Sequence, residues 1–232
     1  MKIEVREASL KDINSLIKLE KEVWGKEGAD KEKISSRIRT FKKGNIILKE
    51  QVNNNILGYI SFQYVNSLDQ NKKIRWFQIT DRGRIEKSHC RNGKFIYGIN
   101  LSIHPEFRNR GYGTFLMLQV WKNMIKNNKK GVYLGSRMPG YKDYLENKKK
   151  VTPEEYVKIK RPDNKLYDKE LRLYRSEGFK IVKVIDNYFP DPESLNYGVL
   201  IYRKNPFWNW PMREALAWLI GLINIKIIRT FI

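Results

Sequence analysis

The order of the predicted elements indicates an α/β fold with a mixed sheet, and three observations support this prediction. Segments in which apolar and polar residues alternate, as in strands, are interleaved with segments whose apolar residues recur at helical spacing. Glycine, proline and asparagine mark the ends of these segments, where turns are expected. Hydrophobic residues make up 41% of the 232 residues, which is enough for a core and excludes wholesale disorder. Such an order of elements predicts a layered domain in which helices flank the sheet.

The first half of the chain is predicted to begin with a strand at residues 2–8. A helix follows that Ser9 caps, with Asp12 in the acidic position of a capping box. Apolar residues then recur at helical spacing as far as Trp24, and a similar stripe predicts a second helix at Lys31–Phe41. The predicted strands that follow are Ile46–Val52 and Ile56–Val65, joined at Asn53-Asn54-Asn55, and then Trp76–Thr80 and Phe95–Ile103.

The second half contains two predicted helices. The apolar segment Gly111–Asn127 predicts a buried helix, because apolar residues cover more than one of its faces. Another helix is expected at Lys165–Glu177, where Gly178 supplies a typical helix-ending residue. Residues 136–164 between them are rich in loop-forming residues. The predicted strands are Val132–Gly135, Lys180–Phe189 and Tyr197–Arg203.

The net charge restricts the classes of partner. Forty-six Lys and Arg residues against 25 Asp and Glu give a formal charge of +21. Such a field attracts polyanions, which include nucleic acid, anionic lipid and phosphorylated cofactors. The excess is equally typical of a lysine-rich compositional bias, and no recognition motif of the common nucleic-acid-binding modules accompanies it. Nucleic acid is therefore not expected as the partner.

Cysteine and histidine are scarce. Cys90 is the only cysteine, which excludes an intrachain disulfide framework and any multi-cysteine metal site. His89 and His104 are the only histidines, so a histidine-built metal centre is not expected either. The first residues show no apolar signal region, and the expected location is the cytoplasm.

The most informative segment is residues 101–114, where a predicted strand gives way to a predicted helix. Gly111 and Gly113 let the backbone approach a ligand closely. The first amides of the helix are unpaired donors at the positive end of its dipole, and Arg108 and Arg110 add two permanent charges. This combination predicts a diphosphate-binding loop. It lacks the Lys-Ser/Thr ending of a nucleotide P-loop and the third glycine of the dinucleotide motif.

The run Arg108-Asn109-Arg110-Gly111-Tyr112-Gly113 resembles the Arg/Gln-x-x-Gly-x-Gly/Ala motif of the GNAT superfamily of N-acetyltransferases. A second signature of that family, aromatic-Tyr-x-x-x-Gly-Phe, is similar to residues 173–179, with Leu173 in the aromatic position. The resemblance implies a mixed, mostly antiparallel central sheet flanked by helices, and acetyl-CoA as co-substrate without a metal. The residues implied to bind acetyl-CoA are Leu101 and Ile103 on the strand and Arg108, Asn109, Arg110, Gly111, Tyr112, Gly113 and Thr114 in the loop.

Tyr174 is the expected general acid for the leaving thiolate, a role that a phenol with a pKa near about 10 can perform. The alternative is a tyrosine that only packs in the core. Many relatives carry Asn one helical repeat before this tyrosine to bind the pantetheine arm, and this chain has Tyr167 there. Asp81 is the first candidate for the base that accepts the proton of the amine. Its alternative is a surface or structural carboxylate.

A narrower resemblance concerns several short stretches. They are similar to acetyltransferase domains that occur alone or fused ahead of a carbon–nitrogen hydrolase domain. The stretches are Ile79-Thr80-Asp81, Pro139-Gly140-Tyr141, Pro153-Glu154-Glu155-Tyr156-Val157, Asn187-Tyr188 with Asp191, and Ser194-Leu195-Asn196-Tyr197. The division expected from this resemblance is an acetyltransferase domain at residues 1–206 and an amphipathic extension at residues 207–232.

A basic segment and an apolar segment are not explained by these resemblances. The run Lys148–Lys150, with Lys129 and Lys130, is typical of a solvated face, or it guides the 3′-phosphate of the cofactor or an acidic partner. The extension at 207–232 is too short in its uncharged part to span a membrane. It suits docking on its own domain, contact with a second subunit, or a membrane interface.

The function expected from the sequence is direct transfer of the acetyl group of acetyl-CoA to a primary amine of a small-molecule or protein acceptor. Two alternatives stay open at this point. One is a catalytically silent module that binds acetyl-CoA or a protein. The other is a basic protein that associates with membranes or nucleic acid and uses the fold only as a scaffold.

Overall fold

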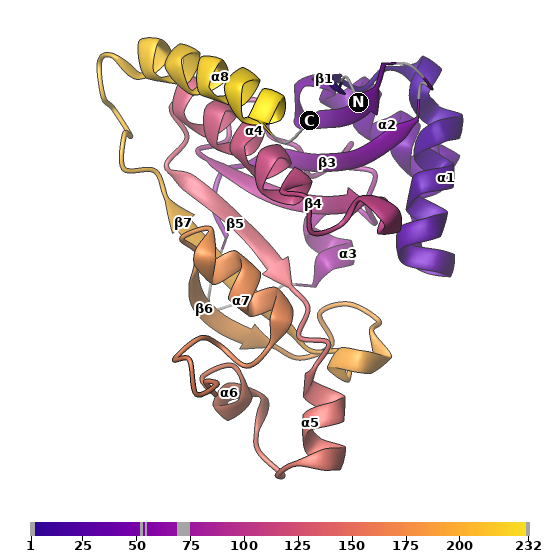
Figure 1. Cartoon of the computed structure of the whole chain (residues 1–232), viewed down its shortest axis with the longest axis vertical. Helices are drawn as coiled ribbons and strands as arrows, with labels where there is room; N and C mark the ends of the chain where they lie inside the picture. Colours follow the sequence, from indigo (N-terminus) through magenta and orange to yellow (C-terminus); the bar gives the residue numbers. More distant parts are fainter. Residues whose placement is uncertain (1–2, 52, 54, 69–74, 231–232) are drawn as a thin grey trace. The chain divides into compact units, whose positions relative to one another are not determined.

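The computed structural model describes residues 3–51, 53, 55–68 and 75–230, with their side chains as far as residue 222. The chain forms two compact units (Figure 1). The first unit comprises Met1–Ser67, Thr80–Gly131 and Asn205–Ile232, and the second comprises Leu68–Ile79 and Val132–Lys204. The predicted α/β class is confirmed, because strands and helices are combined in both units.

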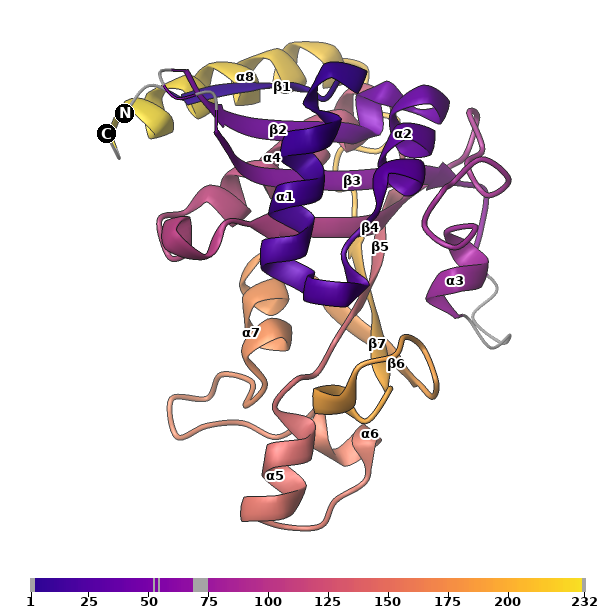
Figure 2. The ribbon, with the colours of Figure 1, turned by 90° about the vertical axis from the view of Figure 1, so that its right-hand side faces the viewer.

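Four antiparallel strands form the sheet of the first unit, in the order β1 (Ile3–Glu7), β2 (Asn45–Glu50), β3 (Ile56–Val65) and β4 (Phe95–Ile103). Every residue of β3 is buried, because helices cover both faces of this sheet (Figure 2). The strands predicted at these positions are confirmed. Val52 and Asn54, from the predicted hairpin region, lie outside the described residues.

The helices of the first unit lie on opposite faces of its sheet. One face carries α1 (Ile13–Trp24) and α2 (Lys31–Thr40), and the other carries α4 (Tyr112–Lys126). The predicted capping box is present before α1, where the amide and hydroxyl groups of Ser9 both donate to Asp12 at 2.8 Å. Hydrogen bonds from the Arg6 guanidinium hold the pKa of the Asp12 carboxyl well below its usual range.

The C-terminal extension ends in α8 (Arg213–Thr230), which packs along α4 (Figure 1). Ala217 of this helix is buried, whereas Trp218 is 63% exposed and Leu219 and Leu222 are exposed beside it. The helix therefore docks on its own unit and still leaves apolar side chains uncovered by the described residues. A second subunit and a membrane interface as partners of these side chains stay predictions. Among the residues that the structure describes, no helix is long and apolar enough to cross a membrane.

The second unit contains three strands, in the order β5 (Gly131–Ser136), β7 (Gly198–Lys204) and β6 (Lys180–Ile185). β6 and β7 are antiparallel. Its helices are α3 (Trp76–Ile79), α5 (Tyr141–Asn147), α6 (Pro153–Tyr156) and α7 (Lys169–Ser176).

The strand predicted at Trp76–Thr80 is wrong, because residues Trp76–Ile79 form the single helical turn α3. The Trp76 amide donates to the carbonyl oxygen of Tyr188 at 3.0 Å, and the ring of Phe189 contacts both Trp76 and Phe77. Aromatic residues of this kind favour strands only when a sheet surface receives them. Here they pack into a local cluster of the second unit.

The start of α7 also differs from the prediction. The helix begins at Lys169 because Asp168 caps it, accepting the amides of Glu170 and Leu171 at 2.9 and 3.1 Å. The predicted end is confirmed, with Gly178 at a φ of +85°. The predicted loop at 136–164 contains α5 and α6. α6 begins with a capping box of Thr152 and Glu155, a signal present in the sequence that the prediction missed.

Candidate functional site

A short turn links β4 to α4 in the first unit. Pro105–Phe107 form one turn of 3₁₀ helix, since the ring of Pro105 cannot continue the ladder of β4. Nδ1 of His104 accepts the amide of Glu106 at 3.3 Å, and its Nε2 lies 2.8 Å from the Glu22 carboxylate. His104 therefore fixes the turn from which the loop 108–111 departs.

The backbone of the loop is left open at the start of α4. Asn109 and Gly111 have φ angles of +61° and +77°, values that favour glycine and asparagine. The first bond of the helix runs from the Phe115 amide to the Gly111 carbonyl at 2.9 Å, so the amides of Gly111, Tyr112 and Gly113 precede the helical ladder. Apart from Gly111 itself and its two neighbours in the chain, no atom of the described residues lies within 4 Å of where a Cβ on Gly111 would sit. The loop thus presents backbone donors to open space.

The two arginines of the loop are exposed and carry no ion pair within the described part of the chain. The Arg108 Nε donates to the carbonyl oxygen of Ile103 at 3.4 Å. The Arg110 guanidinium lies over the Phe107 ring, 5.1 Å from its centroid. Exposed, uncompensated guanidinium groups beside free helical amides suit a diphosphate, which accepts hydrogen bonds from both. The residues present therefore fit the diphosphate of a coenzyme A.

The strand below the loop holds the start of α4 in place. Leu101 and Ile103 of β4 are half-buried. The Ile103 side chain lies under the helix start, with its Cγ1 4.0 Å from where a Cβ on Gly113 would sit. A register shift opposite Ser61 and Phe62 of β3 marks a β-bulge in this pair of strands, which bends β4 before these residues.

The opposite face of β4 carries a buried carboxylate that the prediction missed. Glu20 of α1 is 2% exposed and accepts hydrogen bonds from the Ser102 hydroxyl at 2.6 Å and the Asn100 amide at 2.7 Å. It also accepts the backbone amide of Ala29, and the Trp24 indole donates to Ser102 at 2.7 Å. Glu20 therefore ties α1 to the strand below the loop. Its position in the buried stripe, four residues after Leu16, was the available signal.

Asp81 lies in the first unit, in a turn that directly follows Thr80. Its backbone has a φ of +51°, and its carboxylate accepts the Lys87 amide at 3.2 Å. This bond holds the turn of residues 81–87 together. Its assignment as a base stays a prediction.

The other histidine and the cysteine have structural contacts in the first unit. The His89 ring stacks on Phe41, with ring centroids 4.4 Å apart, and its Nδ1 accepts the Tyr64 amide. The Cys90 amide donates to the Tyr64 carbonyl at 2.9 Å. Lys129, expected on a solvated face, is instead 8% exposed and donates to the Gly93 carbonyl at 2.7 Å. In the described part of the chain, no three His, Cys, Asp or Glu residues gather as metal ligands.

Tyr174 lies on α7 in the second unit. Its ring is half-buried and packs edge-to-face on Phe179, with centroids 5.7 Å apart. Burial raises the pKa of Tyr174, and the nearby Glu170 raises it further while Arg137 opposes this. The phenol therefore keeps its proton at neutral pH, as a general acid must.

An ion-pair cluster beside Tyr174 was not predicted. Arg137 lies 3.1 Å from the Glu170 carboxylate and 3.5 Å from Asp191, whose carboxylate accepts the Ser194 hydroxyl. Burial raises the pKa of Glu170, although Arg137 opposes it. The cluster joins α7 to loops at the ends of β5 and β6. Its members are 33 to 57 residues apart in sequence, counted from Arg137 to Glu170 and to Ser194, so no local pattern indicates them.

Comparison with known proteins shows which family the chain belongs to. The model of the acetyltransferase (GNAT) family matches residues 10–142, more than half of the chain. An uncharacterized N-acetyltransferase of Bacillus subtilis strain 168, YkwB, is 29% identical over 214 residues, which cover 88% of this chain and 89% of YkwB. The GNAT-like decarboxylase GphF, solved with isobutyryl-CoA, is 20% identical, with a TM-score of 0.74 over 87% of this chain and 99% of GphF.

The predicted branch is confirmed as well. YhcX of Bacillus subtilis strain 168, named as a probable hydrolase, is 29% identical over 208 residues. These residues are 88% of this chain but span only 39% of YhcX, as expected for an acetyltransferase domain within a longer fusion. The loop geometry, the fold and the family match agree, and the chain belongs to the acetyltransferase (GNAT) family.

Proposed function

We propose that the protein is an N-acetyltransferase that uses acetyl-CoA and a primary amine. The observation that carries this proposal is the open start of α4, where the amides of Gly111, Tyr112 and Gly113 precede the helical ladder and directly follow two exposed arginines. This arrangement suits the diphosphate of coenzyme A, and the family match supports an acyl-CoA-dependent reaction. When bound, acetyl-CoA supplies a thioester whose carbonyl carbon an amine can attack.

The residues of the chain then have three tasks. The amides of the loop and Arg108 and Arg110 hold the diphosphate, which fixes the position of the thioester and removes the entropic cost of aligning it with the amine. The phenol of Tyr174 donates its proton to the sulfur that leaves. Its raised pKa keeps it protonated across the neutral range.

The third task is to accept the proton of the amine, since an ammonium group cannot attack a carbonyl. Asp81 is the candidate that we retain for this task. The Lys87 amide binds one of its two carboxylate oxygens, and the other accepts no hydrogen bond from another described residue. One oxygen therefore remains for an amine or for a water molecule that carries its proton.

The experiment is a turnover assay that measures thiol release from acetyl-CoA with a panel of primary amines. For Tyr174→Phe we expect kcat to fall about 100-fold, the range of a lost general acid, with the KM for acetyl-CoA unchanged. The matched control is Tyr202→Phe, a half-buried tyrosine of β7 that stacks with Tyr133, and it should leave kcat within twofold.

The outcomes separate the alternatives. Acetyl-CoA binding without turnover on any amine would support a silent binding module. Absence of acetyl-CoA binding by the folded protein, combined with strongly salt-dependent binding to DNA or anionic vesicles, would support the basic scaffold. A normal kcat in Tyr174→Phe would contradict the assignment of the general acid and return Tyr174 to a packing role.

A further inference from the structure

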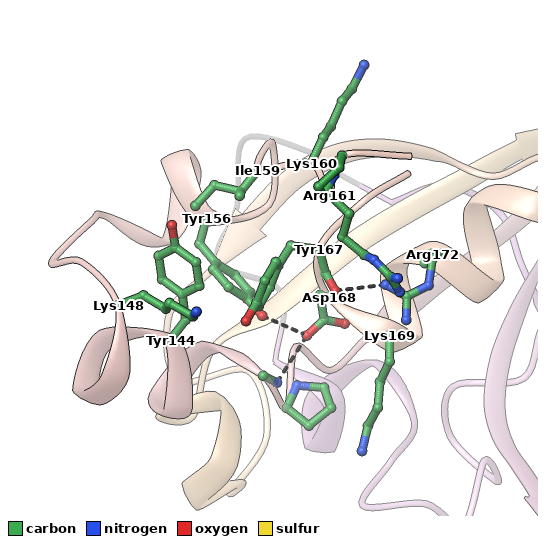
Figure 3. A pocket seen from close by; sticks show the side chains of 13 residues that line it. Tyr144, Lys148, Tyr156, Ile159, Lys160, Arg161, Tyr167, Asp168, Lys169 and Arg172 are labelled. Atoms are coloured by element: carbon green, nitrogen blue, oxygen red, sulfur yellow. Dashed lines mark hydrogen bonds between the residues drawn. The ribbon is translucent and has the colours of Figure 1, made fainter. Parts of the chain in front are cut away.

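The second unit contains a pocket of about 620 Å³ that the proposed acyl transfer does not use (Figure 3). Its wall is formed by α5, α6, the residues before α7, and the start of α7. A volume of this size lies within the range of small-molecule pockets, roughly 300–1,000 Å³. It lies in the branch-specific segment between β5 and α7, which the sequence presented only as a loop-rich region.

One side of the pocket is an aromatic wall. The ring of Tyr144 contacts Tyr156 and Tyr167 with centroids 5.5 and 5.0 Å apart, in edge-to-face geometry. Tyr156 is 1% exposed, while Tyr144 and Tyr167 are half-buried and line the pocket. Rings packed on one another in this way lose little freedom when a flat molecule lies against them.

The floor of the pocket holds a carboxylate that is already occupied. Asp168 is 2% exposed, and its Oδ2 accepts the Gly140 amide at 3.1 Å and the Tyr156 hydroxyl at 3.2 Å. Its Oδ1 accepts the amides of Glu170 and Leu171. Asp168 therefore fixes the wall and the start of α7, and it has no lone pair directed to a cationic ligand.

The rim of the pocket is strongly cationic. Five of the lining side chains are Lys or Arg, and Asp168 is the only acid among them, so the lining carries a charge of +4 (5 − 1). Lys148 and Lys169 have no ion-pair partner within the described residues. The basic residues that line the pocket are Lys148, Lys160, Arg161, Lys169 and Arg172.

Two of these cations lie on the same side of the pocket (Figure 3). Arg172 donates to the carbonyl oxygens of Leu166 and Tyr167, both at 2.8 Å, which fixes its guanidinium in place. The Arg161 Nε lies 3.8 Å from the Asp163 carboxylate, a distance that leaves its remaining donors unused by this exposed pair.

The Asp163 carboxylate lies beside these cations, with its Oδ1 3.8 Å from the Arg161 Nε and its Oδ2 3.7 Å from the Lys165 Nζ. Its pKa is lowered, because a bond from the Lys165 amide and nearby positive charges outweigh the opposing effect of burial. Arg161 and Arg172 are both among these charges. Asp163 does not line the pocket, so an anion inside the pocket can still meet the two guanidinium groups, which bind carboxylates and phosphates through paired hydrogen bonds.

We propose that this pocket binds a small organic anion, a flat molecule whose carboxylate or phosphate contacts Arg161 and Arg172 while its ring lies against Tyr144 and Tyr167. The proposal goes beyond acyl transfer and holds whether or not the chain is an active transferase. Charge supplies the attraction, and the aromatic wall selects flat molecules.

The test uses two pairs of probes that differ only in charge. AMP and adenosine share a ring system and differ by the phosphate, and benzoate and benzamide differ by the carboxylate. Calorimetry on the full chain should give at least tenfold tighter binding for the anionic member of one pair, and the pair that shows it identifies phosphate or carboxylate as the recognised group. AMP is also part of coenzyme A and could therefore bind the loop at the start of α4. The measurement is repeated in Gly113→Glu, in which the loop is blocked, and AMP binding to the pocket should be unchanged.

Variants locate the binding. Arg161 is exposed, so Arg161→Ala should fold normally and weaken the anionic probe at least fivefold, while Arg161→Lys should restore part of the loss. Arg175→Ala is the matched control, since Arg175 is an exposed arginine like Arg161, lies on α7 beside Arg172 and does not line the pocket. Equal binding of charged and uncharged probes, no binding of any probe at about 10 mM, a concentration that detects even a Kd of about 1 mM, or an equal loss in Arg175→Ala would overturn the proposal.

Discussion

The loop at the start of α4 and the pocket beside α7 are both proposed anion sites, but they differ in the parts of the chain that would contact the anion. In the loop the backbone amides of Gly111, Tyr112 and Gly113 precede the helical ladder and are the proposed principal donors, and the two arginines are exposed. In the pocket the charge comes from side chains such as Arg161 and Arg172. A backbone site depends on local conformation, whereas a side-chain site depends on which residues the fold assembles.

This difference determines which substitutions damage each site. A side chain added at a glycine of the loop should act at once, because the space that the ligand needs is filled. In the pocket a single arginine contributes one of several charges, and the largest damage should come from Asp168, which holds the wall. The predictions below follow that contrast from the largest effect to the smallest.

Gly113→Glu should weaken acetyl-CoA binding by about 4 kcal/mol, roughly a thousandfold, because a carboxylate then faces the diphosphate. Folding should not suffer, since an acidic residue in the first turn of a helix is stabilising and the nearest atom to its Cβ lies 4.0 Å away. Calorimetry and thermal unfolding measure the two effects.

The matched control is Gly25→Glu. Gly25 also belongs to the first unit and has open space at its Cβ position, although its φ of +59° adds strain that Gly113 does not have. Its binding of acetyl-CoA should stay within about twofold. An equal loss of acetyl-CoA affinity in both variants would show that the added negative charge acts from any position, and it would contradict a binding site at the loop.

Asp168→Ala should lower the free energy of unfolding by about 3 kcal/mol, because four donors lose their acceptor in a buried place. Asp81→Ala, which removes one bond in an exposed turn, should change it by about 0.5 kcal/mol or less. Urea unfolding followed by circular dichroism gives both values. Similar losses in the two variants would contradict the assigned role of Asp168.

The sequence could predict much of the loop and little of the pocket. Gly111, Gly113 and both arginines lie within six consecutive residues, so their chemistry is visible as a motif. The strand β4 before them and the helix α4 after them have the alternation and the apolar periodicity typical of their classes. Contiguity made this site predictable.

The pocket depends on contacts between residues that are far apart in sequence. Asp168 accepts the Gly140 amide 28 positions away, so its role in the pocket shows only when the fold is known. The turn α3 was mistaken for a strand for the same reason, since Phe189 supplies the packing that its aromatic residues needed. Glu170 was missed because its partner Arg137 lies on another element, whereas the position of Glu20 in the buried stripe of α1 was a signal that the prediction overlooked.

Arg108→Ala and Arg110→Ala should each weaken acetyl-CoA binding about tenfold, or 1.4 kcal/mol. This is far less than the effect of Gly113→Glu, because the amides remain in place when a side chain is removed. Each variant should also reduce the salt dependence of binding. If either arginine variant abolished binding, side chains rather than backbone amides would be the principal donors of the loop.

The smallest expected difference between the two regions is in how the free energy of unfolding depends on alkaline pH. Burial raises the pKa of Tyr156 in the pocket, and the Asp168 carboxylate raises it further. Burial also raises the pKa of Tyr112 at the loop, where Arg110 opposes it. Unfolded tyrosines ionise near about pH 10, whereas these folded tyrosines stay protonated to higher pH. Ionisation therefore stabilises the unfolded state, and the free energy of unfolding falls above that pH.

Tyr156→Phe should therefore flatten this fall, by about 1 kcal/mol between pH 9 and pH 11, and Tyr112→Phe should flatten it less. The slopes against pH are compared rather than the absolute stabilities, since each variant also changes packing. Tyr64, whose pKa burial raises to about 12, provides an internal reference in a spectrophotometric titration. Identical slopes in the two variants would contradict the proposed difference between the regions.

The most direct test of the central claim is a titration of ¹⁵N-labelled protein with acetyl-CoA, followed by backbone amide NMR shifts. If the start of α4 holds the diphosphate, the largest changes should occur at the amides of Gly111, Tyr112 and Gly113, and they should disappear in Gly113→Glu. Binding of acetyl-CoA that leaves these three amides unmoved would contradict the account.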